Sequence, residues 1–288
     1  MFDPRPLGVF DSGLGGLTVV RALMHTLPAE RIVYLGDTAR VPYGTRSAET
    51  VVRYARGCAR VLRGRGVKAL IVACNTVSAV ALDMLRAELD LPVVGVVDPG
   101  AEAAVRAAQA LRVPEGREPM KIGVLGTAGT VLSGAYPRAV ARLSTRLEVV
   151  AEPAPLLVPL VEEGWLEGLV PELAVERYVA PLIARGAGVL VLGCTHYPLL
   201  KDTVARVAAR LAGWEIPIVD SAAATAEAVE KLLKEERVAK APEHVRSHEN
   251  PLELLVTDLP ASFGVMAQRF LGDATVAPVT QIDIQVAV

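Results

Sequence analysis

Short apolar runs alternate with longer amphipathic segments along almost the whole chain, and this alternation limits the fold more than any other feature. We expect strands at the apolar runs Leu7–Phe10, Arg31–Leu35, Val67–Ala73, Pro92–Val97, Lys121–Leu125, Leu147–Ala151, Gly188–Leu192 and Ile216–Val219. Helices are expected between them, at 17–27, 48–63, 77–89, 101–111, 131–143, 175–184, 199–211 and 223–235. Repeated strand–helix–strand units predict mainly parallel sheets, and nearly unbroken apolar strands indicate helices on both faces. The sequence therefore predicts an α/β fold with three layers.

A weak internal repeat divides this pattern in two. The run Gly8-Val9-Phe10-Asp11-Ser12-Gly13 resembles Gly123-Val124-Leu125-Gly126-Thr127-Ala128, and the apolar run that ends at Cys74 resembles the one that ends at Cys194. Each copy thus has a hydroxyl-bearing turn after one strand and a cysteine after a later strand. Ligands of open α/β sheets bind at the carboxyl ends of strands. We therefore predict two similar lobes, each presenting one cysteine to a shared cleft. The polar stretches Val113–Pro119 and Lys240–Pro251 are expected as a connection between lobes and a surface loop, and 252–257 with 262–271 as a final strand and helix.

Composition excludes several classes of function. The 288 residues carry a net charge of −2 at pH 7, with 30 basic and 32 acidic residues. This balance argues against a general nucleic-acid or membrane-surface binder. No apolar stretch is long enough to span a membrane, and residues 1–10 lack the pattern of a signal peptide. With three cysteines and no disulfide pattern, we expect a cytoplasmic protein with free thiols.

Cys74 and Cys194 are the strongest candidates for chemistry. Each ends an apolar strand and precedes a helix, whose N-terminus favours the thiolate form. Either cysteine alone could equally be buried and inert. As a facing pair they suit racemisation. This reaction removes an α-proton from one face of the substrate and returns a proton to the other face. A thiol can serve as either the acid or the base, because it titrates close enough to neutrality. Cys58, in the middle of an expected helix, is interpreted as structural.

The glycine-rich turn Asp11-Ser12-Gly13-Leu14-Gly15-Gly16 follows the first strand. Free backbone amides at the start of the next helix can hold an anion, but the spacing matches neither the dinucleotide fingerprint nor a P-loop. A carboxylate fits such a turn as well as a phosphate does. Asp11 could cap the helix or tune a nearby thiol, and Thr127 and Thr130 could cap a helix, bind a carboxylate, or do both.

His196 lies two residues after Cys194, where it could stabilise a thiolate or carry protons. A metal is not expected, because a Cys-x-His pair lacks the three or four ligands that zinc requires. The acidic pair Glu162-Glu163 alone is typical of a solvated helix end.

Together these segments resemble the glutamate racemase family of the aspartate/glutamate racemase superfamily. The motifs that match, in family order, are Asp11–Gly16, Gly36-Asp37 with Pro42-Tyr43-Gly44, Cys74–Ser78, Gly95–Gly100, Gly126-Thr127 with Thr130, Pro159–Glu162, Gly193–Pro198 and Val219–Ser221. The resemblance implies two α/β lobes related by a pseudo-twofold axis, the first formed by 1–98 with 214–288 and the second by 99–213, with the substrate between them. The family often has a cysteine near Glu152–Pro155, and this chain has none there.

The same resemblance implies roles for individual residues. Cys74 and Cys194 would be the two acid/base residues, with Asp11 assisting the first and His196 with Glu162 assisting the second. The substrate-binding residues would be Asp11, Ser12, Tyr43, Gly44, Asn75, Thr76, Thr127, Thr130, Thr195 and His196. The family uses neither pyridoxal phosphate nor a metal, and it supplies D-glutamate for peptidoglycan synthesis. Its members commonly form homodimers, so a homodimer is compatible with the resemblance.

Three alternatives remain open on the sequence. One is a racemase of the same superfamily that acts on aspartate or hydantoins. Another is a thiol redox protein in which Cys74 and Cys194 form a reversible disulfide, although no Cys-x-x-Cys motif is present. The third is an inactive regulator that binds an amino acid.

Overall fold

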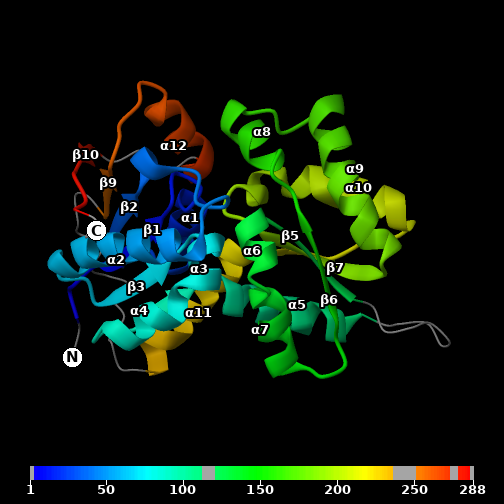
Figure 1. Ribbon diagram of the computed structural model, residues 1–288, viewed down its shortest axis with the longest axis horizontal. Coiled ribbons are helices and arrows are strands. Elements are labelled where there is room, and N and C mark those ends of the chain that lie inside the picture. The colour runs from blue at the N-terminus through cyan, green and yellow to red at the C-terminus, as the bar shows by residue number, and fades with distance from the viewer. Residues whose placement is uncertain (1–2, 112–120, 236–250, 273–277, 286–288) are drawn as a thin grey trace.

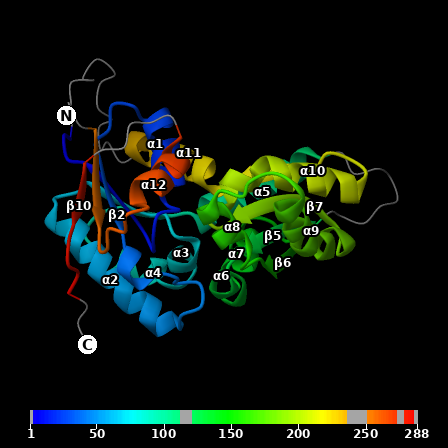
Figure 2. The ribbon, with the colours of Figure 1, turned by 90° about the horizontal axis from the view of Figure 1, so that it is seen from above.

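The computed structural model describes residues 3–111, 121–235, 251–272 and 278–285, which form two α/β lobes lying side by side (Figures 1 and 2). The first lobe holds a six-stranded sheet in the order β10-β9-β2-β1-β3-β4, and the second a four-stranded sheet in the order β6-β5-β7-β8. The strands are β1 Leu7–Asp11, β2 Ile32–Gly36, β3 Ala69–Val72, β4 Val93–Gly95, β5 Lys121–Gly126, β6 Val149–Pro153, β7 Ala187–Gly193, β8 Ile218–Asp220, β9 Leu252–Val256 and β10 Val279–Gln281.

Four strands of the first sheet have the same topology as the second sheet. Every strand pair among the described residues is parallel. The order β2-β1-β3-β4 in the first sheet corresponds to β6-β5-β7-β8 in the second. The first strand of each lobe therefore lies between its second and third. These observations confirm the α/β fold class and the two similar parallel-sheet lobes predicted from the repeat.

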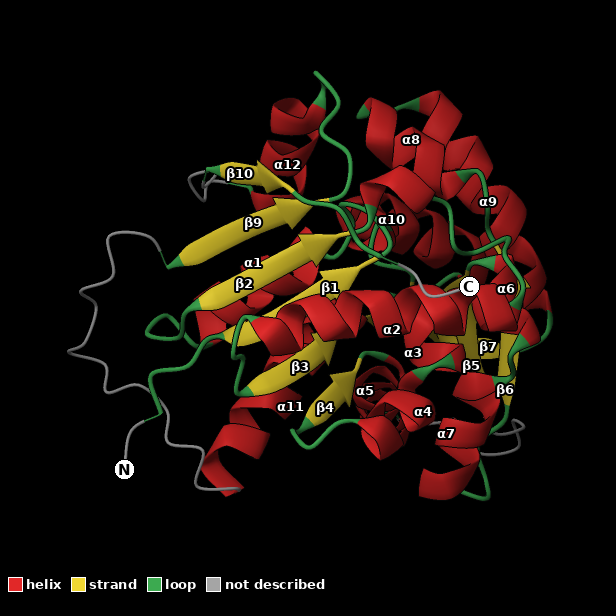
Figure 3. Ribbon diagram, turned by 60° about the vertical axis from the view of Figure 1, so that its left-hand side comes forward, coloured by secondary structure: helices red, strands yellow, loops and turns green. Residues whose placement is uncertain are grey.

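Helices cover both faces of the first sheet (Figure 3). One face packs against α1 Leu17–Thr26, α11 Ser221–Glu235 and α12 Phe263–Leu271. The other face packs against α2 Ala48–Gly64, α3 Asn75–Val80 and α4 Leu82–Glu88. A short 3₁₀ turn, η1 Thr38–Arg40, follows β2.

The second sheet is covered in the same way. On one face lie α5 Val97–Ala110 and α7 Ala135–Leu143. On the other lie α8 Leu157–Glu163, α9 Leu169–Ala184 and α10 Lys201–Ala212, with η2 Tyr197–Leu200 before α10. The short α6 Ala128–Leu132 follows β5. The apolar cluster of α8–α10 continues into that of α1, α11 and α12, so the two lobes share one core on this side.

Several element limits differ from the sequence expectations. The strand expected at Pro92–Val97 ends at Gly95, because the hydroxyl of Ser78 accepts hydrogen bonds from the amides of Val96 and Val97 and starts α5 there. The helix expected at 77–89 is divided at Ala81 into α3 and α4. The helix expected at 131–143 is divided at Gly134, whose φ of 65° ends α6 and begins α7. Strand β10 was not expected. The stretch Val113–Pro119 lies outside the described residues, as does Lys240–Pro251 except for Pro251.

The chain passes between the sheets twice, after β4 and after β8. The last part of the chain returns to the first lobe, where β9 pairs with β2. Because β8 pairs with β7, we propose Asp220 as the end of the second lobe in place of the expected residue 213. Among the described residues, no helix is long and apolar enough to cross a membrane.

Candidate active site

The carboxyl ends of parallel strands meet at one edge of each sheet, and these edges carry the candidate residues. Asp11 is the last residue of β1, and Cys74 lies just beyond β3 at the start of α3. In the second lobe Thr127 follows β5 and Cys194 follows β7. Since β1 corresponds to β5 and β3 to β7, the two cysteines occupy equivalent positions.

Hydrogen bonds join these edges where the two lobes meet. Oγ1 of Thr76 lies 2.9 Å from Oγ1 of Thr127. The Tyr136 hydroxyl donates to Oδ1 of Asn75 over 2.9 Å, and the amide of Gly129 donates to the carbonyl of Gly44 over 2.9 Å. The hydroxyl of Thr18 donates to the carbonyl of Thr195 over 3.0 Å. The two sets of residues predicted from sequence therefore lie together where the lobes meet.

Cys74 is buried at the first-lobe side of this site. Its thiol donates to the hydroxyl of Ser12, with 3.5 Å between Sγ and Oγ. Burial, followed by the negative charge of Asp11, raises the pKa of Cys74 to about 12, and the charge of a Cys194 thiolate adds to this effect. Cys74 is therefore a protonated thiol at neutral pH.

Cys194 lies beside a histidine–carboxylate pair. Its Sγ is 4.0 Å from Nδ1 of His196, and Nε2 of His196 is 3.0 Å from Oε1 of Glu162. Burial lowers the pKa of His196, but the hydrogen bonds to Cys194 and Glu162 outweigh it and raise that pKa to about 10. A protonated His196 next to Cys194 stabilises negative charge on the sulfur. The structure therefore brings the three residues together as the resemblance implied.

Two buried polar atoms in the site have no hydrogen-bond partner among the described residues, namely Oδ1 of Asp11 and Nδ2 of Asn75. Unpaired buried polar atoms are costly, so they commonly mark a place where a ligand supplies the missing partner. The other oxygen of Asp11 accepts from the amide of Gly13 over 3.0 Å. Burial raises the pKa of Asp11, and the positive charge of His196 opposes this effect. A ligand with a carboxylate and an ammonium group would complement the Asn75 donor and the Asp11 acceptor.

Of the two sequence interpretations of Thr127 and Thr130, the structure bears on helix capping. Oγ1 of Thr127 accepts from the amide of Thr130 over 3.2 Å and caps α6. The same oxygen also contacts Oγ1 of Thr130 and Oγ1 of Thr76. The capping interaction therefore holds a row of hydroxyl groups at the cleft.

The side chain of Tyr43 lies away from the cleft. It is buried, and its hydroxyl donates to Asp37, which also accepts from Arg40 and Thr257. Burial raises the pKa of Tyr43, so this hydroxyl stays protonated. A substrate contact at Tyr43, as the resemblance implied, would come from its backbone or from that of Gly44. The sequence around Asp37 indicates only a turn, but its hydrogen bonds to Arg40, Tyr43 and Thr257 fix the loop that follows β2.

Gly15 marks a close approach of the two lobes. A Cβ atom at this position would lie 2.7 Å from Cε1 of His196 and nearer still to Nδ1 of His196 and Oγ1 of Thr195. A glycine is therefore required for the glycine-rich turn to pack against the Cys194 turn.

Other candidates lie outside the site. Cys58 is fully buried in the first-lobe core, in agreement with its structural interpretation. Glu152 forms an ion pair with Arg185 at 2.9 Å. All three cysteines are free, so the disulfide of the redox alternative is not formed. Among the described residues, no group of three or more His, Cys, Asp or Glu side chains is arranged to hold a metal ion.

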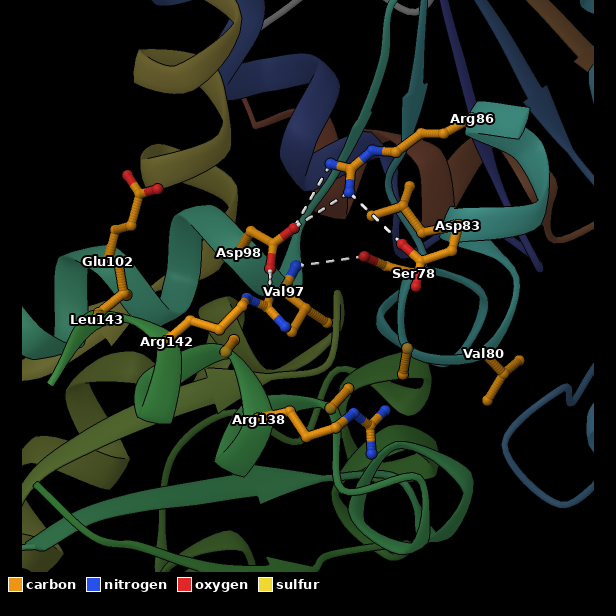
Figure 4. Close-up of a pocket in the computed structure, with 14 residues that line it drawn as sticks. Ser78, Val80, Asp83, Arg86, Val97, Asp98, Glu102, Arg138, Arg142 and Leu143 are labelled. Carbon is orange, nitrogen blue, oxygen red and sulfur yellow. Dashed lines mark hydrogen bonds and ion pairs between the residues drawn. The ribbon is translucent and has the colours of Figure 1, made fainter. Parts of the chain in front are cut away.

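A separate cavity of about 580 Å³ lies between the lobes, against α3, α4, α5 and α7 (Figure 4). Asp98 stands in it between Arg86 of the first lobe and Arg142 of the second, with its carboxylate oxygens 3.5 Å and 2.6 Å from the two guanidinium groups. Neither Cys74 nor Cys194 lines this cavity.

Sequence reasoning missed four residues that contact the predicted ones, namely Thr18, Tyr136, Arg269 and Phe270. Each belongs to a helix whose sequence contains no motif that indicates a function. Their importance comes from partners in the other lobe.

Known proteins resemble this chain in sequence and in structure. The profile of the family described as Asp/Glu/Hydantoin racemase matches residues 9–229. Glutamate racemase of Geobacter metallireducens is 44% identical over 268 residues, which is 93% of each chain. The crystal structure of glutamate racemase from Francisella tularensis in complex with D-glutamate has a TM-score of 0.84 and 32% identity, covering 98% of each chain. An aspartate racemase homologue from Pyrococcus horikoshii shares the fold, with a TM-score of 0.55 and 18% identity over 80% of this chain and 99% of its own.

Proposed function

The chain belongs to the Asp/Glu/hydantoin racemase family, and from this premise we propose that it interconverts L-glutamate and D-glutamate, with Cys74 and Cys194 as the two acid/base residues. The observation that carries this proposal is the placement of two thiols at equivalent strand ends of two lobes that meet in one site. Such a pair can serve opposite faces of one α-carbon. No step in this scheme requires pyridoxal phosphate or a metal.

The unpaired polar atoms support an amino acid as the ligand. The α-carboxylate accepts from Nδ2 of Asn75, and the ammonium group lies at Oδ1 of Asp11, so both buried atoms gain partners. Ser12, Thr76, Thr195 and the loop at Gly44 surround the same site. This arrangement holds the α-carbon between the two sulfurs.

The surroundings of the two thiols support a direction for the first step. With L-glutamate bound, the thiolate of Cys194 removes the α-proton. Protonated His196, which is held by Glu162, stabilises this thiolate. Cys74, which is protonated at neutral pH because its pKa is raised, then delivers a proton to the opposite face. With D-glutamate the two cysteines exchange roles.

We propose glutamate rather than aspartate as the substrate, because the similar proteins named above favour it. The relatives that share 44% and 32% identity with this chain are glutamate racemases, and the second was solved with D-glutamate bound. The aspartate racemase homologue supports the fold alone. Testing L-glutamate and L-aspartate side by side separates these two substrates. We further propose that the D-glutamate serves peptidoglycan synthesis, as the family resemblance implies.

The proposal is tested by incubating the protein with L-glutamate in D₂O without added cofactor. The incoming proton comes from a thiol that exchanges with solvent, so the D-glutamate formed should carry deuterium at the α-carbon. Chiral separation with mass spectrometry measures this directly. Product without α-deuterium, or a requirement for added pyridoxal phosphate, would refute the two-thiol mechanism.

Cellular location and assembly stay proposals as well. Three free thiols fit the reducing cytoplasm, where we place the protein. A homodimer is compatible with the apolar side chains that are exposed along α8 and α9, namely Leu156, Trp165, Leu169, Val170 and Leu173. Light scattering of the purified chain measures its mass in solution.

A further inference from the structure

Helix α12 belongs to the first lobe but reaches the catalytic residues of the second. It packs on α1 and faces α8 at the same end of the molecule (Figure 1). Its adjacent residues Arg269 and Phe270 contact the segment that carries Glu162 and the side chain of His196. The proposed mechanism assigns no role to either residue of α12.

Arg269 is bound to the end of α8. Its Nη1 donates to the carbonyl oxygen of Val161 over 3.2 Å and also to that of Glu162. The carbonyl of Val161 also accepts from the amide of Gly164 over 3.0 Å, so the guanidinium group adds to the hydrogen bonds that end this helix and fixes the backbone there. Gly164, with φ of 80°, ends α8, and a Cβ there would lie 2.6 Å from Nη2 of Arg269. The guanidinium group is thus held close against the turn that follows Glu162.

Phe270 contacts the partner of Glu162. Its ring meets the His196 imidazole edge to face, with 5.1 Å between centroids and 82° between planes. Phe270 is fully buried, whereas the side chain of Glu162 is 46% exposed. His196 is therefore fixed by its surroundings, while the half-exposed carboxylate depends on its backbone for its position.

We propose that Arg269 is a positioning residue for the Cys194 half of the reaction, which holds the backbone of Glu162 so that its carboxylate stays on His196. This inference rests on the proposed function, because it takes Cys194 as the base for the L-enantiomer. Cys74 has different neighbours, Ser12 and Asp11. Loss of Arg269 should therefore impair one thiol and spare the other.

Elimination from 3-chloroglutamate reports on each thiol separately. A thiolate removes the α-proton, the C–H electron pair forms a Cα–Cβ double bond, and chloride leaves from Cβ. The enamine then tautomerises to the imine and hydrolyses to 2-oxoglutarate and ammonium, both of which can be measured. Only one base is needed, so the L-analogue reports on Cys194 and the D-analogue on Cys74.

The decisive variant is Arg269→Gln. Its kcat/KM for elimination from the L-analogue should fall by roughly 10-fold, within the 100-fold that a displacement of about 1 Å can cost, while elimination from the D-analogue should change little. Arg269→Lys, which keeps the charge and one donor, should restore part of the L-activity. The matched control is Arg210→Gln on α10, which removes an exposed ion pair with Glu176 and should leave both activities unchanged.

The outcomes distinguish the inference from the proposed function. If the wild type eliminates neither analogue, the two-thiol function fails. If the wild type eliminates both and Arg269→Gln lowers both equally, or leaves the L-to-D ratio within twofold of the wild type, Arg269 has only a structural role or none. If Arg269→Gln loses its thermal unfolding transition, Arg269→Lys is judged instead, by whether its L-to-D ratio falls several-fold.

Discussion

Substitution of Gly15 by alanine should separate the two halves of the site without unfolding either lobe. The added Cβ would lie 2.7 Å from Cε1 of His196, whereas ordinary contact begins near 3.4 Å, so the Cys194–His196 turn must withdraw by about 0.7 Å at this atom and further at the nearer ones. A displacement near 1 Å costs about 100-fold in rate, which corresponds to about 2.7 kcal/mol of transition-state stabilisation. We therefore expect kcat/KM for racemisation to fall by about two orders of magnitude in both directions.

The assay follows the change in circular dichroism as L-glutamate is converted to the racemate. The matched control is Gly64→Ala, because Gly64 is the last residue of α2 and a Cβ there meets nothing within 4 Å. Its activity should equal that of the wild type. Both variants should unfold within a few degrees of the wild type, since Gly64 ends a helix and the overlap at Gly15 is confined to the side chains of Thr195 and His196. If Gly15→Ala keeps kcat/KM within threefold of the wild type, the close approach of the two turns is not required for catalysis.

Three further predictions follow from individual contacts. Cys74→Ala and Cys194→Ala should each abolish racemisation, yet the first should retain elimination from L-3-chloroglutamate and the second from the D-analogue; retention on the same enantiomer by both would contradict the assignment. Because burial and the charge of Asp11 raise the pKa of Cys74 to about 12, elimination from the D-analogue by Cys194→Ala should increase about 10-fold per pH unit from pH 7 to 9, and a flat profile would contradict a protonated Cys74. Lys68→Met should lower the free energy of unfolding in urea by about 3–5 kcal/mol, because it removes one partner of the buried ion pair that Lys68 forms with Glu30 at 2.6 Å; a loss under 1 kcal/mol would show that the pair is dispensable.

The features predicted correctly from sequence are those that local patterns encode. Apolar runs located nine strands of the two sheets because a buried parallel strand is apolar along its whole length. Cys74 and Cys194 could each be placed at the carboxyl edge of a sheet, because parallel strands bring their carboxyl ends to one edge. The repeat then put these edges in equivalent positions, which made a two-thiol site the natural interpretation.

The features that sequence could not provide depend on contacts between distant segments. The carbonyl of Glu162 accepts from Arg269, which is more than a hundred residues later, and no periodicity links the two. The hydroxyl of Tyr43 is directed away from the cleft because Asp37 accepts it. The packing of lobes and loops brings such residues into contact, and a single sequence contains no local pattern that predicts these contacts.

The two passages of the chain between the lobes lie close together, since a Cβ on Gly100 at the start of α5 would be 3.4 Å from that of Ser221 at the start of α11. Two neighbouring connections, unlike a single one, restrain how one lobe can turn relative to the other, and the apolar core that the lobes share adds to this restraint. The relative placement of the turns that carry Cys74 and Cys194 is thus set by covalent connections as well as by packing.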